Sequence, residues 1–372
     1  MIEILCQFLE MSNVQNQITY SFFDGGAYYN DANSNGKYSP VSEDVKKNVR
    51  IILENYLEPL INVDFVEVSD AGSGYGAIRY VVTTDKNVEH ARAYNPSLSG
   101  APIGGDVHLQ KTDHDKGKFN RGPGTEDFEV LMHETLHALG LKHPDNGDGE
   151  TPGPYLYFDE QNKTYTMMVS HETGGASDPA ATPMPYDIEA LQYLYGAKAQ
   201  NATNATYSFQ KVYQYTVDGK TWGSATPQKI IIVDGGGTDE LNFSNLAADP
   251  LGYYFDLRSG FITAKSAYMN TPYTTPDDPE QRKYYTHEYG TAVSKKAIVE
   301  NVIGSSSNDV IIGNDANNNF NGDNGNDYLE GGKGNDTLTG GNGADIFRLD
   351  IAGGSDTIIA LRKKKKVLYL RE

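Results

Sequence analysis

The sequence predicts two domains of different class. The first is an α+β domain with a mixed twisted sheet and an active-site helix, and the second is an all-β domain that contains a parallel β-roll. Three observations lead to this prediction. The stretch HETLHALGLKHP, residues 133–144, holds three of the chain's eight histidines. Helix and strand patterns alternate up to about residue 200. Beyond it helix patterns are absent, and the content of glycine, asparagine and aspartate rises. A nonapeptide pattern repeats from 304 to 348.

The α+β prediction rests on segments of the first 200 residues with clear periodicity. Two helices are expected: an amphipathic one over 42–60, opened by Ser42, and a last one over 186–196, ended by Gly196. Runs of β-branched and aromatic residues, bounded by glycine or polar turns, predict strands over 17–23, 62–69, 76–82 and 104–110.

The active-site helix is predicted over residues 126–140, where acidic residues open the pattern and apolar residues surround two histidines. His133 and His137 are four residues apart and leave one face of a helix. Gly140 can take the positive φ that ends the helix, and the reversed chain then returns His143 to the other two. Three neutral imidazoles and a water form an open zinc site of the catalytic kind, beside which Glu134 can lie without binding the metal.

The β-roll prediction rests on five consecutive nonapeptides between 304 and 348. Glycines permit tight turns, and the apolar residue at position eight starts a short inward-facing strand. Position six holds an aspartate in four of them, Asp309, Asp327, Asp336 and Asp345, and such carboxylates are calcium ligands. Asn318 replaces the aspartate of the second repeat and should weaken the site there. A flexible glycine-rich linker would not keep aspartate and apolar residues in fixed phase.

Composition limits the classes of partner and compartment. A length of 372 residues suits two domains, which we expect at 1–200 and 201–372. A net charge of −19 argues against nucleic acid and anionic membrane surfaces. The single cysteine, Cys6, excludes an internal disulfide. No apolar run is long enough to span a membrane, and residues 1–13 predict a short amphipathic helix rather than a signal peptide.

The histidine motif followed by these repeats resembles the serralysins, secreted bacterial zinc endopeptidases of the metzincin group. The resemblance runs roughly from residue 18 to 359. It is most specific in HETLHALGLKHP, YTMM, DIEALQYLYGA, DGGGTDELNFS and VENVIGSSSNDVIIGN. It implies an N-terminal catalytic domain with a deep zinc cleft, followed by a parallel β-roll loaded with calcium.

The resemblance also implies roles for particular residues. One catalytic zinc would be held by His133, His137 and His143, with Glu134 as the catalytic base and Met168 below the metal in the Met-turn. Several structural calcium ions would be held by the aspartates of the repeats and by residues ahead of them, namely Asp234, Gly236, Asp239 and Glu300. Substrate would add as a strand along the edge of 104–110, which makes Gly105, Asp106 and Val107 the expected contacts.

One position departs from the family pattern. Serralysins carry a tyrosine two residues beyond the Met-turn methionine, where it ligates zinc reversibly and helps to stabilise the transition state. Ser170 stands there in this chain, and His171 follows it. Three histidines still suffice to hold zinc, so we expect a bound metal and slower hydrolysis than in relatives with the tyrosine.

The expected function is therefore that of a secreted, zinc-dependent endopeptidase stabilised by calcium. The resemblance implies a monomer that acts on proteins or peptides and is exported by a type I route without a signal peptide, and it allows for a proteinaceous inhibitor. Nucleic acid binding and membrane insertion are not expected. The alternative is a secreted calcium-binding protein that retains the zinc site with weak or no activity. Ser170 favours this alternative, and the intact Glu134 favours the enzyme.

The last thirteen residues, 360–372, differ from the rest of this acidic chain because they hold six of its 31 basic residues. Two interpretations of this basic tail are open. One is a basic strand that pairs with the acidic roll. The other, favoured by the abrupt change after Ile359, is a shifted reading frame that leaves the roll without its closing strand and impairs export.

Overall fold

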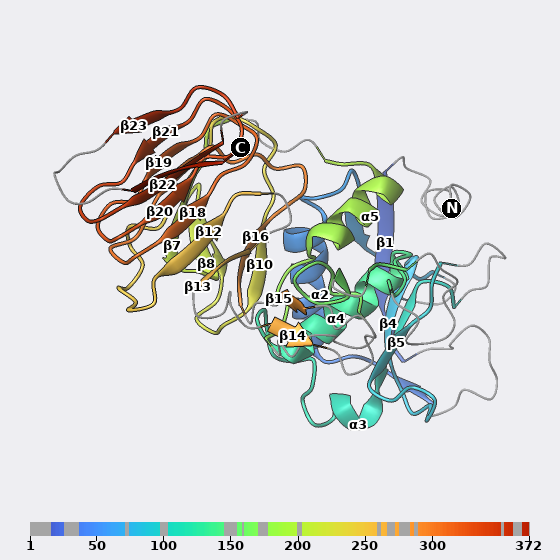
Figure 1. Cartoon of the computed structure of the whole chain (residues 1–372). Helices are drawn as coiled ribbons and strands as arrows, with labels where there is room; N and C mark the ends of the chain where they lie inside the picture. The colour runs from blue at the N-terminus through green and yellow to red at the C-terminus, as the bar shows by residue number, and fades with distance from the viewer. Residues whose placement is uncertain are drawn as a thin grey trace. The chain divides into compact units, whose positions relative to one another are not determined.

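The structure is a computed structural model, shown in Figure 1. It describes residues 16–25, 37–70, 74–96, 103–144, 155–157, 160–169, 178–198, 203–258, 262–265, 272–274, 283–285, 289–350, 353–359 and 367–371. Only the backbone is described for 262–265, 272–274, 283–285, 350 and 367–371. The expected helix over 1–13, with Cys6, lies outside these ranges.

The described residues form two compact units. The first unit contains those up to Leu156, together with 167–169 and 181–198. The second contains Tyr157, 160–166 and 178–180, together with all described residues from 203 onward. A single boundary at residue 200 therefore does not describe the two units, because short segments around the Met-turn belong to the second.

The first unit is built on a six-stranded mixed sheet. Its strands are β1 (Gln17–Phe22), β2 (Tyr38–Ser39), β3 (Asp64–Glu67), β4 (Ile78–Thr83), β5 (Ala91–Ala93) and β6 (Asp106–Gln110). They lie in the order β3-β1-β4-β6-β5, with β2 paired to β4. Strands β1, β3, β4 and β6 are parallel, whereas β2 and β5 are antiparallel to their neighbours. The four strands predicted from sequence are present. The two antiparallel strands are too short to produce a periodic pattern.

The helices of the first unit follow the predicted pattern, with two differences: the short helix at 111–114 is not predicted from the sequence, and part of the first helix is wound differently. They are α2 (Glu43–Arg50), the π-helical segment η1 (Ile51–Leu57), α3 (Lys111–His114), α4 (Glu126–Ala138) and α5 (Pro185–Tyr195). Ser42 caps α2, with its Oγ accepting a hydrogen bond of 3.2 Å from the Val45 N–H. The second half of this helix is wound more widely, and the Glu58 N–H donates to the Leu53 carbonyl five residues earlier. In so short a segment, the spacing of the apolar residues is compatible with an α-helix and with a π-helix, so the sequence does not distinguish them.

One face of the sheet carries the helices and forms the core of this unit. The Tyr20 hydroxyl on β1 donates to Glu54 of η1 at 3.3 Å. The Tyr80 hydroxyl on β4 lies 3.0 Å from Thr135 Oγ1 of α4. Both tyrosines are buried, and Figure 1 shows α4 lying along this part of the sheet. This packing holds α4, which carries His133 and His137, beside β5 and β6.

The regular elements described in the second unit are all β-strands. They are β7 (Thr206–Lys211), β8 (Gln214–Val217), β9 (Lys220–Gly223), β10 (Lys229–Ile232), β11 (Glu240–Asn242), β12 (Tyr253–Asp256), β13 (Ile262–Lys265), β14 (Pro272–Thr274), β15 (Lys283–Tyr285), β16 (Gly290–Val293), β17 (Asn301–Ile303), β18 (Val310–Ile312), β19 (Asn319–Asn321), β20 (Tyr328–Glu330), β21 (Thr337–Thr339), β22 (Ile346–Asp350), β23 (Thr357–Ile359) and β24 (Val367–Arg371).

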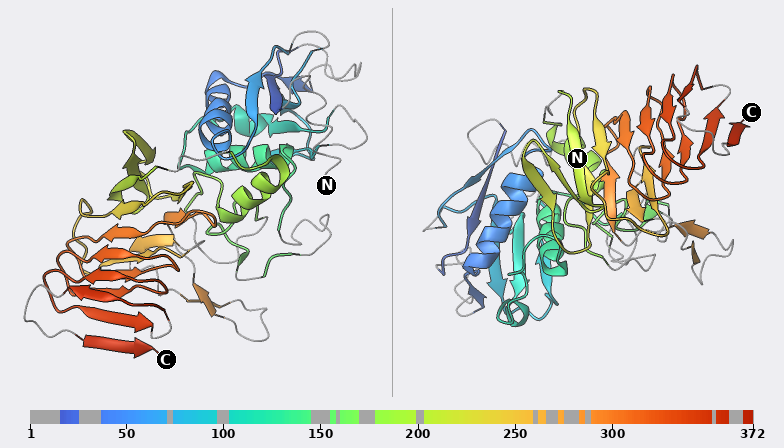
Figure 2. Two further views of the ribbon diagram at one scale, coloured as in Figure 1. Left: turned by 90° about the horizontal axis from the view of Figure 1, so that it is seen from above. Right: turned by 90° about the vertical axis from the view of Figure 1, so that its left-hand side faces the viewer.

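The repeats form two facing stacks of short parallel strands, which Figure 2 shows from two sides. One stack runs β12-β18-β20-β22 and the other β11-β17-β19-β21-β23, so that consecutive strands of the chain alternate between the stacks. Each nonapeptide ends in one strand. The residues at position eight are buried, as predicted: Ile311, Phe320, Leu329, Leu338 and Phe347. This alternation and inward packing agree with a β-roll.

The basic tail contributes a strand to this arrangement. Strand β24 pairs in parallel with β22, with Val367 opposite Ile346 and Arg371 opposite Asp350. This pairing agrees with the reading of the tail as a strand that adds to the roll. Lys363–Lys366 lie outside the described residues. Within the part of the chain that the structure describes, we find no helix with the length and apolar character that a bilayer span demands.

Candidate metal centre

Helix α4 begins and ends where the sequence indicates. Thr125 caps its start by accepting a hydrogen bond from a backbone N–H three residues later. At its end Gly140 has a φ of 100°, and its N–H donates to the His137 carbonyl. The next N–H, that of Leu141, donates to the Leu136 carbonyl. These two bonds form a Schellman motif, in which glycine takes the left-handed conformation. The chain therefore reverses directly after His137.

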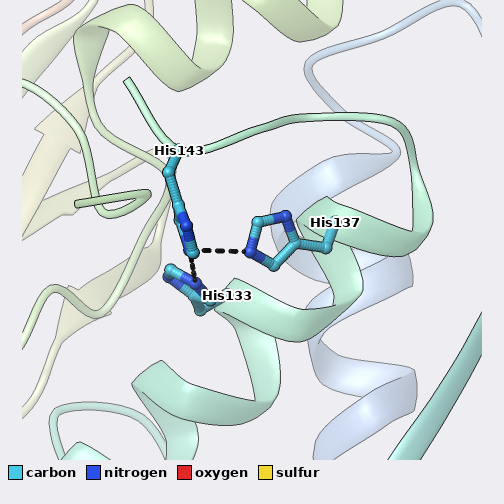
Figure 3. A group of neighbouring side chains, drawn as sticks. All are labelled: His133, His137 and His143. Atoms are coloured by element: carbon cyan, nitrogen blue, oxygen red, sulfur yellow. Dashed lines mark hydrogen bonds between the residues drawn. The ribbon is translucent and has the colours of Figure 1, made fainter. Parts of the chain in front are cut away.

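The reversal brings three imidazoles together, and Figure 3 shows their rings pointing toward one another. The Nε2 atom of His143 lies 3.2 Å from Nε2 of His133 and 3.0 Å from Nε2 of His137. The three ligand atoms lie within 4.8 Å of one another. A tetrahedral zinc ion with bonds of about 2.05 Å separates its ligands by about 3.3 Å. The nitrogens therefore have nearly the separation that a shared zinc ion requires.

Backbone carbonyls set the tautomer of two of these rings. The Nδ1 atom of His133 lies 2.8 Å from the Met167 carbonyl oxygen, and Nδ1 of His137 lies 2.8 Å from that of Leu141. A carbonyl can only accept, so each Nδ1 carries the hydrogen and each Nε2 carries a lone pair. Metal-binding histidines are commonly oriented in this way. Lone pairs aimed at a common point repel one another unless a cation lies between them. The donor set therefore fits a zinc ion.

The Met-turn segment supports one of the rings and is anchored by α5. Met167 and Met168, the residue expected below the metal, are both buried. The Met167 N–H donates to Asp187 Oδ2 at 2.9 Å, and the same oxygen accepts from the Met184 N–H at the start of α5 at 2.8 Å. Asp187 thus fixes the residue whose carbonyl holds His133. It is absent from the residues predicted for the site, because an acid three residues into a helix indicates only a cap.

Ser170 and His171, the residues at the departure from the family pattern, lie outside the described residues.

Glu134 follows His133 on α4 and is buried. Its Oε2 atom accepts a hydrogen bond of 2.6 Å from the Ala93 N–H in β5. Burial raises the pKa of Glu134 to about 7, against the smaller opposing effects of this N–H and of the Arg92 charge. A cation held by the imidazoles would lower this pKa, because it stabilises the carboxylate. The helix that carries His133 and His137 thus also carries a carboxyl group whose pKa burial brings near neutrality.

The structure corrects the expected substrate contacts. The sequence predicts Gly105, Asp106 and Val107 along a sheet edge, but β6 lies inside the sheet between β4 and β5. All three residues are buried, and Val107 pairs with β4 on one side and β5 on the other. A strand that is paired along both edges cannot accept a further strand. Among the described strands, the one at this end of the sheet is β5, whose three residues form no recognisable pattern in the sequence.

The side chains at position six of the nonapeptides lie in two columns, one on each flank of the roll. Asp309, Asp327 and Asp345 form the first column at intervals of 18 residues. Asn318 and Asp336 belong to the second. In each column a backbone N–H donates to the side chain one coil later, as from Asp309 to Asp327 Oδ1 at 2.9 Å. All five side chains are buried.

Carboxylate oxygens in both columns remain for a cation. Oδ2 of Asp327 and Oδ2 of Asp336 are buried and have no hydrogen-bond partner within the described residues. Burial raises the pKa of Asp327 to about 8 and that of Asp336 to about 6. A buried charge without a partner is costly, and calcium prefers such hard oxygen ligands. Both columns therefore fit calcium.

The four calcium ligands expected ahead of the repeats also lie close together. Asp234 Oδ1 accepts from the Gly236 N–H at 2.7 Å, and Glu300 Oε2 accepts from the Asp239 N–H at 2.8 Å. Oδ2 of Asp239 is buried and has no hydrogen-bond partner in the described part of the chain. Burial, together with the charges of Asp234 and Glu300, raises the pKa of Asp239 to about 6. A cation here would offset this concentration of negative charge.

Two features of the roll are hidden by the nonapeptide period. Asp356 Oδ1 accepts from the Asp336 N–H at 3.0 Å, so Asp356 extends the second column after 20 residues instead of 18. The two extra residues interrupt the period, which is why the pattern ends at 348 in the sequence. The asparagines that precede the aspartates join neighbouring coils, as where Asn308 Oδ1 accepts from the Asn326 N–H at 2.7 Å.

Comparison with known proteins agrees with both halves of this description. The family model for the RTX calcium-binding nonapeptide repeat matches residues 299–329 and 321–358. Serralysin of Proteus mirabilis is 29% identical over 322 residues, which cover 79% of this chain and 59% of the relative. Serralysin G of Dickeya chrysanthemi is 28% identical over 282 residues, covering 71% and 52%. Metalloprotease AprA of Pseudomonas entomophila (strain L48) is 28% identical over 229 residues, covering 56% and 45%.

The chain thus spans about half the length of the relatives it matches. The likeness is to proteins named as metalloproteases, and the matched repeats coincide with the two strand stacks. The chain is similar to the serralysins over much of its length and carries RTX calcium-binding repeats.

Proposed function

We propose that the chain is a zinc-dependent endopeptidase of the metzincin type, which acts outside the cell on proteins or peptides. The observation that carries this proposal is the convergence of three histidine Nε2 atoms, two of them from the helix that also carries the buried Glu134. The peptidase function is assigned to the first unit and calcium binding to the second. An extracellular location fits a calcium-binding roll, because calcium sites of extracellular modules have dissociation constants of about 0.1 to 1 mM.

The chain's own residues supply the proton transfers of peptide hydrolysis. A zinc ion on His133, His137 and His143 would act as a Lewis acid and make an attacking water more acidic. Glu134 takes a proton from that water and then gives it to the leaving amine. Release of the Ala93 hydrogen bond frees Glu134 Oε2 for this exchange. The carbonyls of Met167 and Leu141 keep the rings of His133 and His137 in place throughout.

Substrate is proposed to bind along β5 rather than β6. No other described strand pairs with the outer edge of β5, and its Ala93 N–H already reaches Glu134. A peptide added to this edge would pass the imidazole cluster and be recognised mainly through its backbone.

Zinc content and peptide hydrolysis together test the proposal. The protein should contain about one zinc per chain, and its cleavage of casein should stop with a zinc chelator and return when zinc is restored. The alternative of a calcium-binding protein with a relic site predicts bound zinc without chelator-sensitive cleavage. The intact Glu134 favours the enzyme.

Replacement of Asp187 by asparagine should weaken zinc binding by about tenfold, because outer-shell partners of metal ligands usually contribute 10- to 100-fold. Asparagine has the same shape but lacks the charge that holds the Met167 and Met184 N–H groups. Competition with a zinc-binding dye measures the affinity. The matched control is Asp127→Asn, which removes a buried aspartate on α4 that pairs with Arg121. If both variants lose stability equally and neither loses zinc affinity, Asp187 only caps α5.

A further inference from the structure

The first coil of the roll differs from the later coils in how its ligand positions are satisfied. We define the first coil as residues 300–321, which contain β17, β18 and β19 together with the turns between them. The later coils begin at Gly322. In the first coil the side chains at position six are Asp309 on one flank and Asn318 on the other.

Asn318 uses its amide group where a carboxylate would face a cation. Its Nδ2 donates to the Glu300 carbonyl and to Asn314 Oδ1, both at 3.1 Å. Its Oδ1 accepts from the Asn314 N–H at 3.1 Å. The side chain is buried. A calcium ion joins oxygens from adjacent turns, and here the two amide hydrogens contact such oxygens instead. On the flank that holds Asn318, the hydrogen bonds of the first coil therefore satisfy the oxygens that a cation would otherwise bind.

The carboxylate of Asp309 is also satisfied by hydrogen bonds within the protein, but from other donors. Its Oδ2 accepts from the Ser305 N–H at 2.6 Å, and its Oδ1 accepts from the Ser305 hydroxyl at 2.9 Å. The Ser305 hydroxyl oxygen in turn accepts from the Ser307 N–H at 3.0 Å. Both oxygens of this buried carboxylate thus have donors within the first coil.

The later coils lack these donors. At the corresponding turns of the next coil the residues that replace Ser305 and Asn314 are Asp323 and Gly332, and neither brings a side-chain donor. The Oδ2 atoms of Asp327 and Asp336 are the buried oxygens without a hydrogen-bond partner described above. Both of these oxygens belong to the later coils.

A cation-free first coil can still position the next one. Asn308 Oδ1 accepts from the Asn326 N–H at 2.7 Å, and Asn317 Oδ1 accepts from the Asn335 N–H at 2.8 Å. These bonds need no cation, and they set the register in which the second coil lies on the first.

We propose that residues 300–321 fold without calcium and form the template on which calcium orders the later coils. The inference rests on the proposed calcium binding of the repeats. It gives the roll a direction of assembly, from its first coil toward β23. It also predicts that the Asn318 position has no calcium ion of its own.

Hydrogen exchange of the whole chain tests the template. In calcium-free buffer, backbone amides within 300–321 should exchange at least about tenfold more slowly than those within 322–350. Added calcium should protect 322–350 and change 300–321 little. Equal, fast exchange of both segments without calcium would overturn the template. Absence of any calcium effect on 322–350 would instead contradict calcium binding itself.

Substitution of Asn318→Asp tests the role of the amide. This variant should bind one more calcium ion per chain in equilibrium dialysis, and its first coil should lose protection in calcium-free buffer. The matched control is Asn319→Asp, which adds the same charge at an exposed neighbouring position and should change neither result. An Asn318→Asp protein with unchanged calcium content and unchanged protection would refute the assignment. The exchange of the wild-type chain decides the template question even if this variant does not fold.

Discussion

Replacement of Glu134 by glutamine should reduce peptide hydrolysis by about 100- to 10,000-fold, the usual contribution of a general base, while the protein keeps its zinc. The reason is geometric. The side chains that could hold the metal are those of His133, His137 and His143, and Glu134 is not a member of this group. Glutamine preserves the size of the buried side chain but cannot take a proton from water. Metal analysis and the rate of cleavage of a peptide substrate, measured on the same preparation, check both halves of this expectation.

Two further variants isolate the role of Glu134. His137→Ala should lose both zinc and activity, because it removes one of three ligands. Glu129→Gln changes another buried glutamate on α4, five residues closer to the helix start, and should leave hydrolysis within about twofold of the wild type. If Glu134→Gln retained full activity with zinc bound, another group would have to be the base. If it lost its zinc, the carboxylate would have a part in holding the metal.

The imidazole cluster could be predicted from the sequence because its geometry is local. His133 and His137 share a helix face, and Gly140 reverses the chain within three residues of His143. Such short-range relations depend on helix periodicity and on the φ that glycine allows, and not on the rest of the fold. The inward position of Ile311 and its equivalents is predictable for the same reason, since a nine-residue period places them at one point of every coil.

The parts of the site that depend on contacts between distant segments could not be predicted in this way. The place of β6 inside the sheet follows from its pairing with β5, a strand of three residues with no pattern of its own. The contact of Asp187 with Met167 joins residues 20 positions apart. Asp356 escaped the repeat pattern because two inserted residues shifted its phase, although its place in the column is kept. Local periodicity carries no information about any of these relations.

Removal of calcium should disorder residues 322–350 at pH 8, and the effect should be smaller at pH 5. In the ion-free protein, burial raises the pKa of Asp327 to about 8 and that of Asp336 to about 6. Unfolded aspartates titrate near pH 4. The folded roll therefore binds more protons than the unfolded chain between about pH 4 and pH 8. Its stability without calcium is greatest below about pH 4 and is lost as the pH rises through 6 to 8.

Calcium should reverse this dependence, because protons and calcium compete for the same carboxylates, so the calcium-loaded roll should gain stability as the pH rises. Hydrogen exchange of 322–350 between pH 5 and pH 8, corrected for the intrinsic exchange rate and measured with and without calcium, would show the two opposite slopes. Chelators that bind calcium also remove zinc, so the comparison should be repeated in His137→Ala, in which only calcium remains to be removed. Equal slopes with and without calcium would mean that the buried aspartates of the two columns are not where the ion binds.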